Sequence, residues 1–373
     1  MKECQYKDLN TSQRILLGPG PSMVSPRVLR AMSTPLIGHL DPEFLTIMDE
    51  EQQLLREVFQ TENALTLAVP GTGSAGMEAA LCNFIEEGDP VLVVVIGYFG
   101  ERLCAVAERC GAEVHRIEVP WGMACDPNDI ETALKQRTYK LMALVHAETS
   151  TGVLQPDIAA ITSIAHQQGV LVLLDTVTSL GGIPVKIDEW NVDIAYSGTQ
   201  KSLSCPPGLA PITVSQRAEE VLSNRHSPIA SFYLDLKLLA QYWQSPHTYH
   251  HTAMISNHYA LRESLRIALE EGLEARFARH RKNAEVLWEG LDELGIPPLI
   301  PLENRLSTLT TPQLKPGMDD AAIRHRLLDE YNIEISGGFG QLAGKIWRIG
   351  LMGYSSRPEN VLLLLAALRE IIA

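Results

Sequence analysis

A lysine at the end of the segment 192–201, VDIAYSGTQK, is the first candidate for chemistry in this chain. Residues 192–196 have the pattern of a short buried strand, and the Ser-Gly-Thr that follows is typical of a turn. Lys201 then leads into SLSCPPG, which is apolar, small and interrupted by prolines. Such a lysine is either a surface residue or a partly desolvated amine with a lowered pKa, and only the second kind acts as a nucleophile.

A glycine-rich turn is the second candidate. Residues 71–76, GTGSAG, match the G-x-G-x-x-G pattern of dinucleotide-binding turns. A nicotinamide site also needs an acidic residue at the end of the next strand, but the stretch VLVVVIG ends in glycine. What remains is either a plain helix cap or a helix N-terminus where Thr72, Gly73 and Ser74 offer hydroxyl and N–H groups to one phosphate.

Three further residues stand in or after strand-like stretches. Asp175 closes VLVLLD, where a buried carboxylate needs a cation or a proton donor beside it. Phe99 follows another apolar stretch and either fills core or offers a flat ring for stacking. Arg348 lies in KIWRIG between apolar residues and either reaches water or binds a carboxylate.

Together these groups match the needs of one cofactor. A pyridine ring that carries an aldehyde and a phosphate needs a lysine for the aldehyde, a carboxylate beside its nitrogen, an aromatic face and a helix N-terminus for the phosphate. That cofactor is pyridoxal 5'-phosphate, for which a lysine adduct and an acidic partner of the pyridinium nitrogen are the known protein setting. We therefore predict that Lys201 is a buried reactive amine.

The elements that must position these groups alternate along the first two thirds of the chain. Strand-like stretches are predicted at residues 65–69, 91–97, 113–119, 140–148, 170–175 and 193–198. Helix-like stretches separate most of them, which predicts an α/β fold with a mostly parallel sheet covered on both faces. Ligands of such sheets bind outside the carboxyl ends of the strands, where several of the candidate residues lie.

The pattern changes after about residue 256, where a long polar helix signal is followed by shorter strand-like and helix-like stretches. This looser order predicts a second, α+β domain joined to the first by a long helix. We therefore predict an N-terminal arm at 1–15, a large cofactor-binding domain at 16–265 and a small C-terminal domain at 266–373.

Composition excludes several classes of partner. The formal net charge of −14 argues against nucleic acid and against an anionic membrane surface, which both favour clustered Lys and Arg. Six cysteines, from Cys4 to Cys205, lack metal-site spacing, so we expect free thiols and no metal. The longest apolar run, 91–99, is too short for a bilayer, and neither end resembles a targeting signal, so a cytoplasmic location is expected.

A series of sequence blocks carries a family resemblance. In order they are LLGPGPSMVSPRVLRAM, GHLDPEF, GTGSAGMEAAL, ETSTGVLQP, LLDTVTSLGG, YSGTQKSLSCPPG, YHHT and KIWRIGLMG. They resemble the alanine–glyoxylate and serine–pyruvate (or serine–glyoxylate) aminotransferases, in the class V branch of fold-type I pyridoxal-phosphate enzymes. The likeness runs from about residue 14 to 370 and implies a large domain with a seven-stranded, mostly parallel sheet and a smaller C-terminal domain.

The resemblance implies roles for residues at the lysine and phosphate ends of the site. SGTQK makes Lys201 the Schiff-base lysine and Gln200 a neighbour that contacts the cofactor phosphate. GTGS assigns Thr72, Gly73 and Ser74 to that phosphate, although animal members often carry histidine where Ser74 stands.

It also implies roles around the cofactor ring. Asp175 would be the partner of the pyridine nitrogen, and Val177 would pack on the ring. Phe99 would stack on it, where many relatives use tryptophan. Thr149, in ETSTG, would lie beside the cofactor hydroxyl.

Two further blocks concern the substrate and a second subunit. RIGLMG makes Arg348 the clamp for the substrate carboxylate, and the turn GPGP, with Gly20, would line the substrate pocket. YHHT implies that Tyr249 and Thr252 reach the phosphate of the other subunit, so a homodimer with shared active sites is expected.

The resemblance predicts ping-pong transamination of L-alanine, and also of L-serine, with glyoxylate through a Lys201 aldimine, giving pyruvate or hydroxypyruvate and glycine. One alternative is serine as the main donor, and another is a non-catalytic partner protein on the same scaffold. A cysteine desulfurase would need a cysteine late in the chain, whereas none follows Cys205. A dehydrogenase that uses GTGSAG would need the missing ribose acid.

Overall fold

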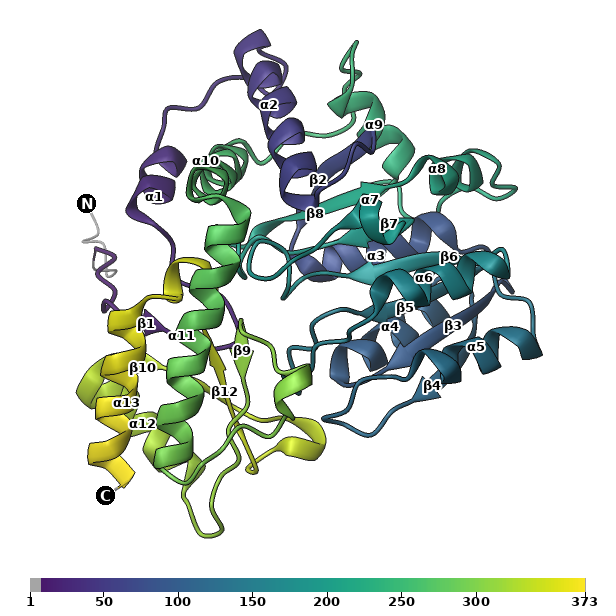
Figure 1. Cartoon of the computed structure of the whole chain (residues 1–373). Helices are drawn as coiled ribbons and strands as arrows, with labels where there is room; N and C mark the ends of the chain where they lie inside the picture. The colour runs from purple at the N-terminus through teal and green to yellow at the C-terminus, as the bar shows by residue number, and fades with distance from the viewer. Residues whose placement is uncertain (1–7, 373) are drawn as a thin grey trace, which may run out of the picture.

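A seven-stranded sheet forms the centre of the larger part of the molecule in the computed structural model, which describes residues 8–372 (Figure 1). Its strands lie in the order β2 (Leu65–Gly71), β8 (Gly208–Val214), β7 (Ile194–Tyr196), β6 (Leu171–Asp175), β5 (Leu141–Val145), β3 (Pro90–Val95) and β4 (Glu113–Glu118). β8 is antiparallel to both of its neighbours, whereas the pairs from β7 to β4 are parallel. The α/β class and the mostly parallel sheet are therefore as predicted.

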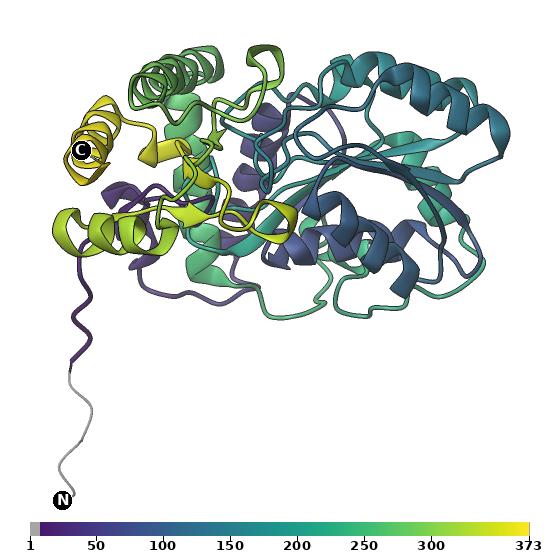
Figure 2. The same cartoon turned by 90° about the horizontal axis from the view of Figure 1, so that it is seen from below.

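The central strands are apolar along nearly their whole length. β5 and β6, LMALV and LVLLD, are buried at every residue, and β3, PVLVVV, is buried after its first residue. Parallel strands require such uninterrupted apolar runs because helices cover both of their faces. Here the helices α3 (Gly73–Phe84) and α4 (Tyr98–Arg109) lie on one face, and α5 (Pro127–Gln136) and α6 (Ile158–Gln167) on the other (Figures 1 and 2).

Further helices complete this larger part. They are α1 (Pro26–Met32), α2 (Pro42–Phe59), α7 (Ile187–Trp190), α8 (Gln216–Ser223), α9 (Leu236–Trp243) and α10 (Ile255–Glu271). Several begin with the signals that sequence rules require: proline follows the N-caps Ser25 and Asp41, and each of these caps accepts a backbone N–H of the first turn.

A second hydrophobic core lies in the C-terminal part. It is built from α11 (Leu273–Glu293), α12 (Asp320–Tyr331) and α13 (Pro358–Ile372) around short strands. One sheet has the order β11 (Ser336–Gly337), β12 (Trp347–Gly350) and β9 (Leu309–Thr310), and it is antiparallel. Short 3-10 helices lie at η1 (Leu302–Asn304), η2 (Gly340–Leu342) and η3 (Gly353–Ser355).

The predicted joining helix is in fact two helices. α10 ends at Glu271 and α11 begins at Leu273, because Gly272 between them has a φ of +83°, outside the helical range. Leu261 and Leu265 of α10 pack in the larger core, whereas Leu287 and Leu291 of α11 pack in the second core. The change of core therefore takes place across this break.

The N-terminal segment crosses to the second core. β1 (Ile15–Leu16) pairs in parallel with β10 (Ile333–Glu334), and Leu17 is fully buried among the residues of that core. The predicted limits at 15/16 and 265/266 stay predictions, although Leu17 falls on the large-domain side of the first.

β8 is missing from the sequence-based prediction. Its sequence, GLAPITV, carries Pro211 in the middle of the strand, a residue that usually argues against a strand with partners on both sides. The strand nevertheless pairs with β2 along its whole length, and the Pro211 carbonyl accepts a hydrogen bond at 2.7 Å from the backbone nitrogen of Ser197.

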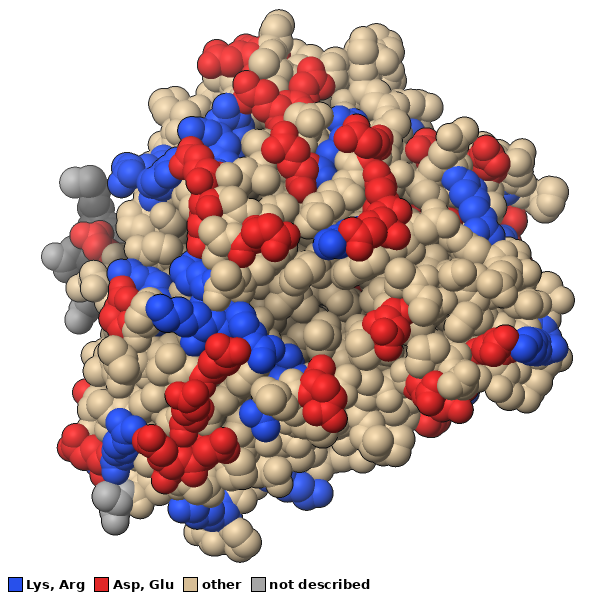
Figure 3. All heavy atoms as spheres, in the orientation of Figure 1, with Lys and Arg blue, Asp and Glu red and all other residues tan. Residues whose placement is uncertain are grey.

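The surface carries mixed charge. On the face drawn in Figure 3, Lys and Arg side chains lie among Asp and Glu side chains. Within residues 8–372, no helix combines the length and the apolar character needed to cross a membrane. Five of the cysteines, from Cys82 to Cys205, are free thiols, and Cys4 lies outside the described residues.

Candidate active site

The carboxyl end of the sheet brings the lysine, the aspartate and the glycine-rich turn together. Asp175 is the last residue of β6, and Lys201 follows β7, its neighbour in the sheet. The turn after β2 lies against the same place, since a Cβ added at Gly73 would be 3.0 Å from Val177 and 3.7 Å from Gly198. Residues that are far apart in the sequence thus line one small region.

Lys201 is a buried amine. Its side chain is 9% exposed, and its Nζ donates a hydrogen bond to the Pro19 carbonyl. Burial, with a smaller contribution from the positive charge of Arg348, lowers the pKa of Lys201 from 10.5 to about 8. An amine in this state is neutral and nucleophilic at mildly alkaline pH.

Gly20 leaves the space that the lysine occupies. Its φ is +120°, a conformation that L side chains rarely adopt, and an added Cβ would lie 2.7 Å from Lys201 Nζ. The GPGP turn thus lies against the Lys201 side chain, and its role in lining the substrate pocket stays a prediction.

Asp175 is buried with two donors. Tyr196 donates its hydroxyl at 2.5 Å, and the backbone N–H of Val177 donates at 2.8 Å. Burial still raises the pKa of Asp175 from 3.8 to about 6, although both hydrogen bonds and the charge of Lys201 oppose the rise. A carboxylate in this environment gains from a cationic partner, such as a protonated ring nitrogen.

Tyr196 is a site residue that sequence reasoning missed. It ends β7 and pairs directly with Asp175 across the two parallel strands. The sequence did contain a signal for this contact, because VLVLLD and DIAYSG both end in polar residues at the same edge of the sheet. A tyrosine within an apolar strand is, however, normally interpreted as a core residue.

The phosphate end consists of free donors and a nearby cation. Thr72 is the N-cap of α3 and makes no capping hydrogen bond with its side chain, and the first N–H groups of a helix have no intrahelical partner. Arg102 donates to the Ser74 hydroxyl at 3.2 Å. The Gln200 Oε1 is buried without a hydrogen-bond partner among the described residues. The N–H groups at the start of α3 and the Arg102 guanidinium make this end suited to an anion, whereas the Gln200 oxygen is an acceptor and adds nothing to that.

The residues predicted beside the cofactor ring, Phe99, Val177 and Thr149, come after the carboxyl ends of β3, β6 and β5, and their contacts with a ring stay predictions. Phe99 and Val177 are half-buried, and Thr149 is buried with its hydroxyl bonded to that of Thr178. Arg102 lies over the Phe99 ring at 4.9 Å. The Phe99 ring thus lies close to the cation that also contacts Ser74.

Glu148 is a second residue that sequence reasoning missed. It is fully buried, and its carboxylate accepts the N–H groups of Phe99 at 3.2 Å and Ser150 at 3.0 Å, and the Ser150 hydroxyl at 2.6 Å. Burial raises its pKa. Gly97 has to be glycine, since an added Cβ would lie 2.5 Å from Glu148 Cγ. Glu148 precedes Thr149 at the end of the strand-like stretch 140–148, and this position in the sequence could have indicated a site residue.

Arg348 reaches the region from the second core. It lies on β12, donates its Nε to the Gly337 carbonyl at 2.9 Å and stacks over the Phe339 ring at 4.3 Å. Burial lowers its pKa to about 10, which the charge of Glu148 opposes. Its two terminal nitrogens make no hydrogen bond with any of residues 8–372, so they are free to bind a carboxylate.

Tyr249 and Thr252 are not brought to this site within one chain. Both are exposed in the segment between α9 and α10, and the Tyr249 ring lies 5.3 Å from that of His39. No hydrogen bond joins either residue to Lys201 or Asp175 in the part of the chain that the structure describes.

These residues fit pyridoxal phosphate. The vacant N–H donors at the start of α3 suit the phosphate, and the buried Asp175 carboxylate suits the protonated ring nitrogen. Lys201 supplies the amine, and Arg348 supplies a separate carboxylate site. Among residues 8–372, no three His, Cys, Asp or Glu side chains are placed to hold a metal ion.

Comparison with known proteins agrees with this geometry. The family model described as aminotransferase class-V matches residues 15–358. The chain is 43% identical to the (S)-ureidoglycine–glyoxylate transaminase of Bacillus subtilis, over 98% of this chain and 92% of that protein. It is 40% identical to the alanine–glyoxylate aminotransferase of Drosophila melanogaster, over 98% and 94%. The crystal structure of an alanine–glyoxylate aminotransferase from Nostoc sp. superposes with a TM-score of 0.98 at 50% identity, covering 100% and 98% of the two chains.

Proposed function

The chain belongs to the class-V aminotransferase family, whose members depend on pyridoxal phosphate, and we propose that it transfers the amino group of L-alanine to glyoxylate. L-Serine is a second donor in this proposal, and the products are pyruvate or hydroxypyruvate and glycine. The observation that carries it is the convergence of Lys201, Asp175 and Arg348 from separate segments on one site.

Each of these three residues has a distinct task. When bound, pyridoxal phosphate supplies an electron sink in conjugation with the α-carbon of the amino acid. Lys201, as a free amine, would accept the proton of that α-carbon at its Nζ and then donate it onward, so this one residue would serve as base and as acid. Asp175 would hold the ring nitrogen in its protonated form, because its carboxylate is buried and gains from a cationic partner.

Arg348 orients both substrates in the same way. Alanine and glyoxylate share a carboxylate, and the two free terminal nitrogens of Arg348 match it in a bidentate geometry that lysine does not offer. Phe339 stacks on one face of the guanidinium, which leaves its edge for the carboxylate.

Glyoxylate as acceptor is supported by the relatives, since the Bacillus and Drosophila proteins are both named for their use of glyoxylate. Alanine as donor is supported by the walls beside Arg348. The rings of Phe339 and Tyr98 meet there edge to face, with centroids 4.7 Å apart. A methyl group packs against such rings without loss, whereas a ureido group would leave polar atoms unpaired.

A second candidate is (S)-ureidoglycine as the donor. The 43% identity to the Bacillus subtilis transaminase favours it. Side-by-side measurement of kcat/KM for L-alanine, L-serine and (S)-ureidoglycine, each with glyoxylate, separates the candidates. The proposal expects the highest value for L-alanine, and a value for ureidoglycine that exceeds it would reverse the assignment.

A homodimer with shared sites is part of the proposal. Because Tyr249 and Thr252 are exposed and make no hydrogen bond to Lys201 or Asp175 within residues 8–372, they are available to the phosphate site of a second copy.

The experiment that tests the catalytic assignment uses Lys201→Ala and, as a control, Lys282→Ala at an exposed position of α11. The Lys201 variant should retain the fold and bind pyridoxal phosphate without the visible absorbance of the lysine adduct. Its kcat should fall by about three orders of magnitude, since the variant loses both the adduct and the proton carrier. Full turnover in this variant would show that the amine has been misassigned.

A further inference from the structure

The backbone that follows Lys201 is held by side chains from three other segments. Three consecutive carbonyls, of residues 201, 202 and 203, each accept a side-chain hydrogen bond. The donors are, in order, Ser22, Arg276 and Ser264. The serines use neutral hydroxyl groups, whereas Arg276 makes a charge-assisted bond, which is the stronger kind.

Arg276 has a partner for every part of its guanidinium. It is 4% exposed, and its NH2 donates to the Ser202 carbonyl at 2.7 Å. Its Nε donates to the Gly181 carbonyl at 2.7 Å, in the segment that continues from Asp175. Its NH1 binds the Glu271 carboxylate at 2.8 Å. The residue therefore links the backbone beyond the lysine to the backbone beyond the aspartate.

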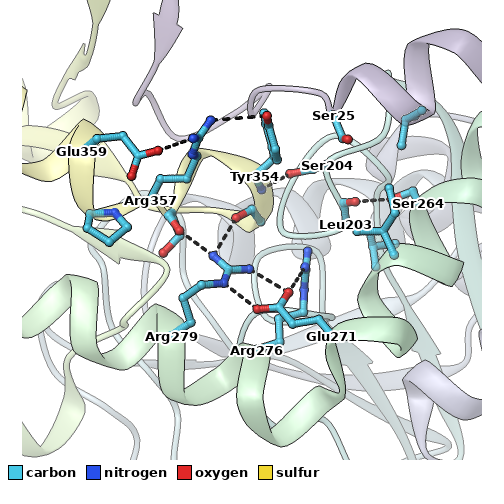
Figure 4. A pocket seen from close by; sticks show the side chains of 15 residues that line it. Ser25, Leu203, Ser204, Ser264, Glu271, Arg276, Arg279, Tyr354, Arg357 and Glu359 are labelled. Carbon is cyan, nitrogen blue, oxygen red and sulfur yellow. Dashed lines mark hydrogen bonds and ion pairs between the residues drawn. The ribbon is translucent and has the colours of Figure 1, made fainter.

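Glu271 is shared with a second arginine (Figure 4). Arg279 binds the Glu271 carboxylate through Nε at 2.5 Å and NH2 at 3.0 Å. Its NH1 donates to the carbonyls of Gly353, at 3.1 Å, and Ser356. This turn follows β12, which carries Arg348, so one carboxylate at the break between α10 and α11 connects both halves of the site.

The segment that follows Lys201 is only partly fixed by van der Waals packing. A cavity of about 420 Å³ lies behind it, lined by Leu203, Ser204 and Gly353 together with both arginines (Figure 4). Where neighbouring atoms are missing, a loop loses contacts that would otherwise fix it, so hydrogen bonds carry more of the task.

We propose that Arg276, oriented by Glu271, is a positioning residue that fixes the Ser202 carbonyl and thereby directs the Lys201 amine toward the cofactor aldehyde. The inference rests on the proposed role of Lys201. It makes the ion pair of Glu271 with Arg276 and Arg279 a determinant of the reaction, although the side-chain hydrogen bonds of these three residues within residues 8–372 go to one another and to backbone carbonyls.

The test separates cofactor retention from formation of the lysine adduct. Arg276→Ala leaves the phosphate donors, Asp175 and Lys201 in place, so the full-length variant should retain pyridoxal phosphate after dialysis. The fraction of retained cofactor that shows the visible absorbance of the lysine adduct should fall about tenfold, the lower end of the effect of one charge-assisted hydrogen bond. Arg281→Ala, an exposed residue of the same helix paired with Glu285, is the control and should match wild type.

Chemical rescue makes the test specific. The cavity beside Arg276 can admit a guanidinium ion, so millimolar guanidinium chloride should restore most of the adduct fraction in Arg276→Ala and leave Arg281→Ala unchanged. If Arg276→Ala does not fold, Glu271→Gln keeps the volume of the side chain and weakens both ion pairs, and its adduct fraction should fall about threefold.

Two results would overturn the proposal: an adduct fraction in Arg276→Ala and Glu271→Gln equal to that of wild type, or a parallel loss of retention and adduct that guanidinium does not reverse. A wild-type protein that retains the cofactor but forms no adduct would instead contradict the role of Lys201, so the two failures are distinguishable.

Discussion

At the scale of single residues, the same desolvation acts in opposite directions on the two central groups. Burial lowers the pKa of Lys201 to about 8 and raises that of Asp175 to about 6. Their charges oppose both shifts, yet the amine still approaches neutrality near physiological pH. The site thus holds a nucleophilic amine and a carboxylate in need of a cation, the two properties that a pyridoxal cofactor requires.

The lowered pKa predicts the pH dependence of cofactor capture. The neutral amine attacks the aldehyde, so the rate at which the cofactor-free chain forms the visible adduct should rise with pH to a midpoint near 8. Stopped-flow absorbance between pH 6 and 11 measures this midpoint. A midpoint near 10.5, the value of an exposed lysine, would show that Lys201 is solvated.

The same shift predicts a stability effect. Between pH 8 and 10.5 the unfolded chain binds more protons at residue 201 than the folded chain, so this group's contribution to the free energy of unfolding rises with pH there. Below pH 8 the buried positive charge of Lys201 lowers the free energy of unfolding by about 3 kcal/mol. Lys201→Met should therefore stabilise the cofactor-free protein at pH 7 and lose this advantage by pH 10.5, as denaturant titration at both pH values would show.

The location of a residue at the edge of the sheet could be predicted from the sequence where it depended only on the end of a strand. Lys201, Asp175 and Phe99 follow strand-like stretches, and the parallel sheet brings such ends together. Tyr196 and Glu148 were missed because their importance lies in hydrogen bonds to other parts of the chain, which spacing alone does not encode.

At the scale of elements, Glu148 connects the end of β5 to the start of α4. Its carboxylate accepts two backbone N–H groups and one hydroxyl, which fixes the first turn of the helix that carries Phe99. A carboxylate suits these donors because it only accepts.

Glu148→Gln should therefore loosen Phe99. The amide NH2 would face a donor, and one buried N–H would lose its acceptor, so the Kd for pyridoxal phosphate should rise about fivefold. Equilibrium dialysis measures this change, with Glu131→Gln, an exposed residue of α5 paired with Lys135, as the control. Equal affinity in the two variants would show that Glu148 does not support the cofactor site.

Among the elements, uninterrupted apolar runs predicted the central parallel strands correctly, since strands covered on both faces leave that signature. Two features were wrong or missing for local reasons. β8 was not predicted because Pro211 lies in the middle of its sequence. The predicted joining helix was wrong because Gly272 divides it, although the helical sequence pattern continues on both sides of this glycine. The family, the fold type and the cofactor inferred from the sequence blocks are confirmed.

At the scale of the whole molecule, the site lies between two hydrophobic cores. Lys201 and Asp175 belong to elements of the larger core, whereas Arg348 lies on a strand whose residues pack in the second. In the proposed function, substrate binding by Arg348 and cofactor binding by Lys201 and Asp175 would therefore be divided between the two cores, and the Glu271 ion pairs join the segments that follow these residues. Dimerisation and a cytoplasmic location stay predictions.

Shared sites predict complementation between inactive variants. In a dimer formed from a Lys201→Ala subunit and a subunit with Tyr249→Ala and Thr252→Ala, one site carries both defects and the other carries none. Coexpression should therefore restore up to about a quarter of wild-type activity under random pairing. Activity that stays at the mean of the two separate variants would show that Tyr249 and Thr252 do not serve a second subunit.

Transamination between L-alanine and glyoxylate through Lys201 is tested most directly by one measurement. It is the visible absorption spectrum of the purified protein during successive addition of the two substrates. We expect the absorbance of the lysine adduct to disappear with L-alanine and to return with glyoxylate, and to be absent throughout in Lys201→Ala. Loss of absorbance with (S)-ureidoglycine but not with L-alanine would contradict the proposed donor. If the wild-type protein stays colourless after addition of pyridoxal phosphate, both the cofactor and the role of Lys201 would be contradicted.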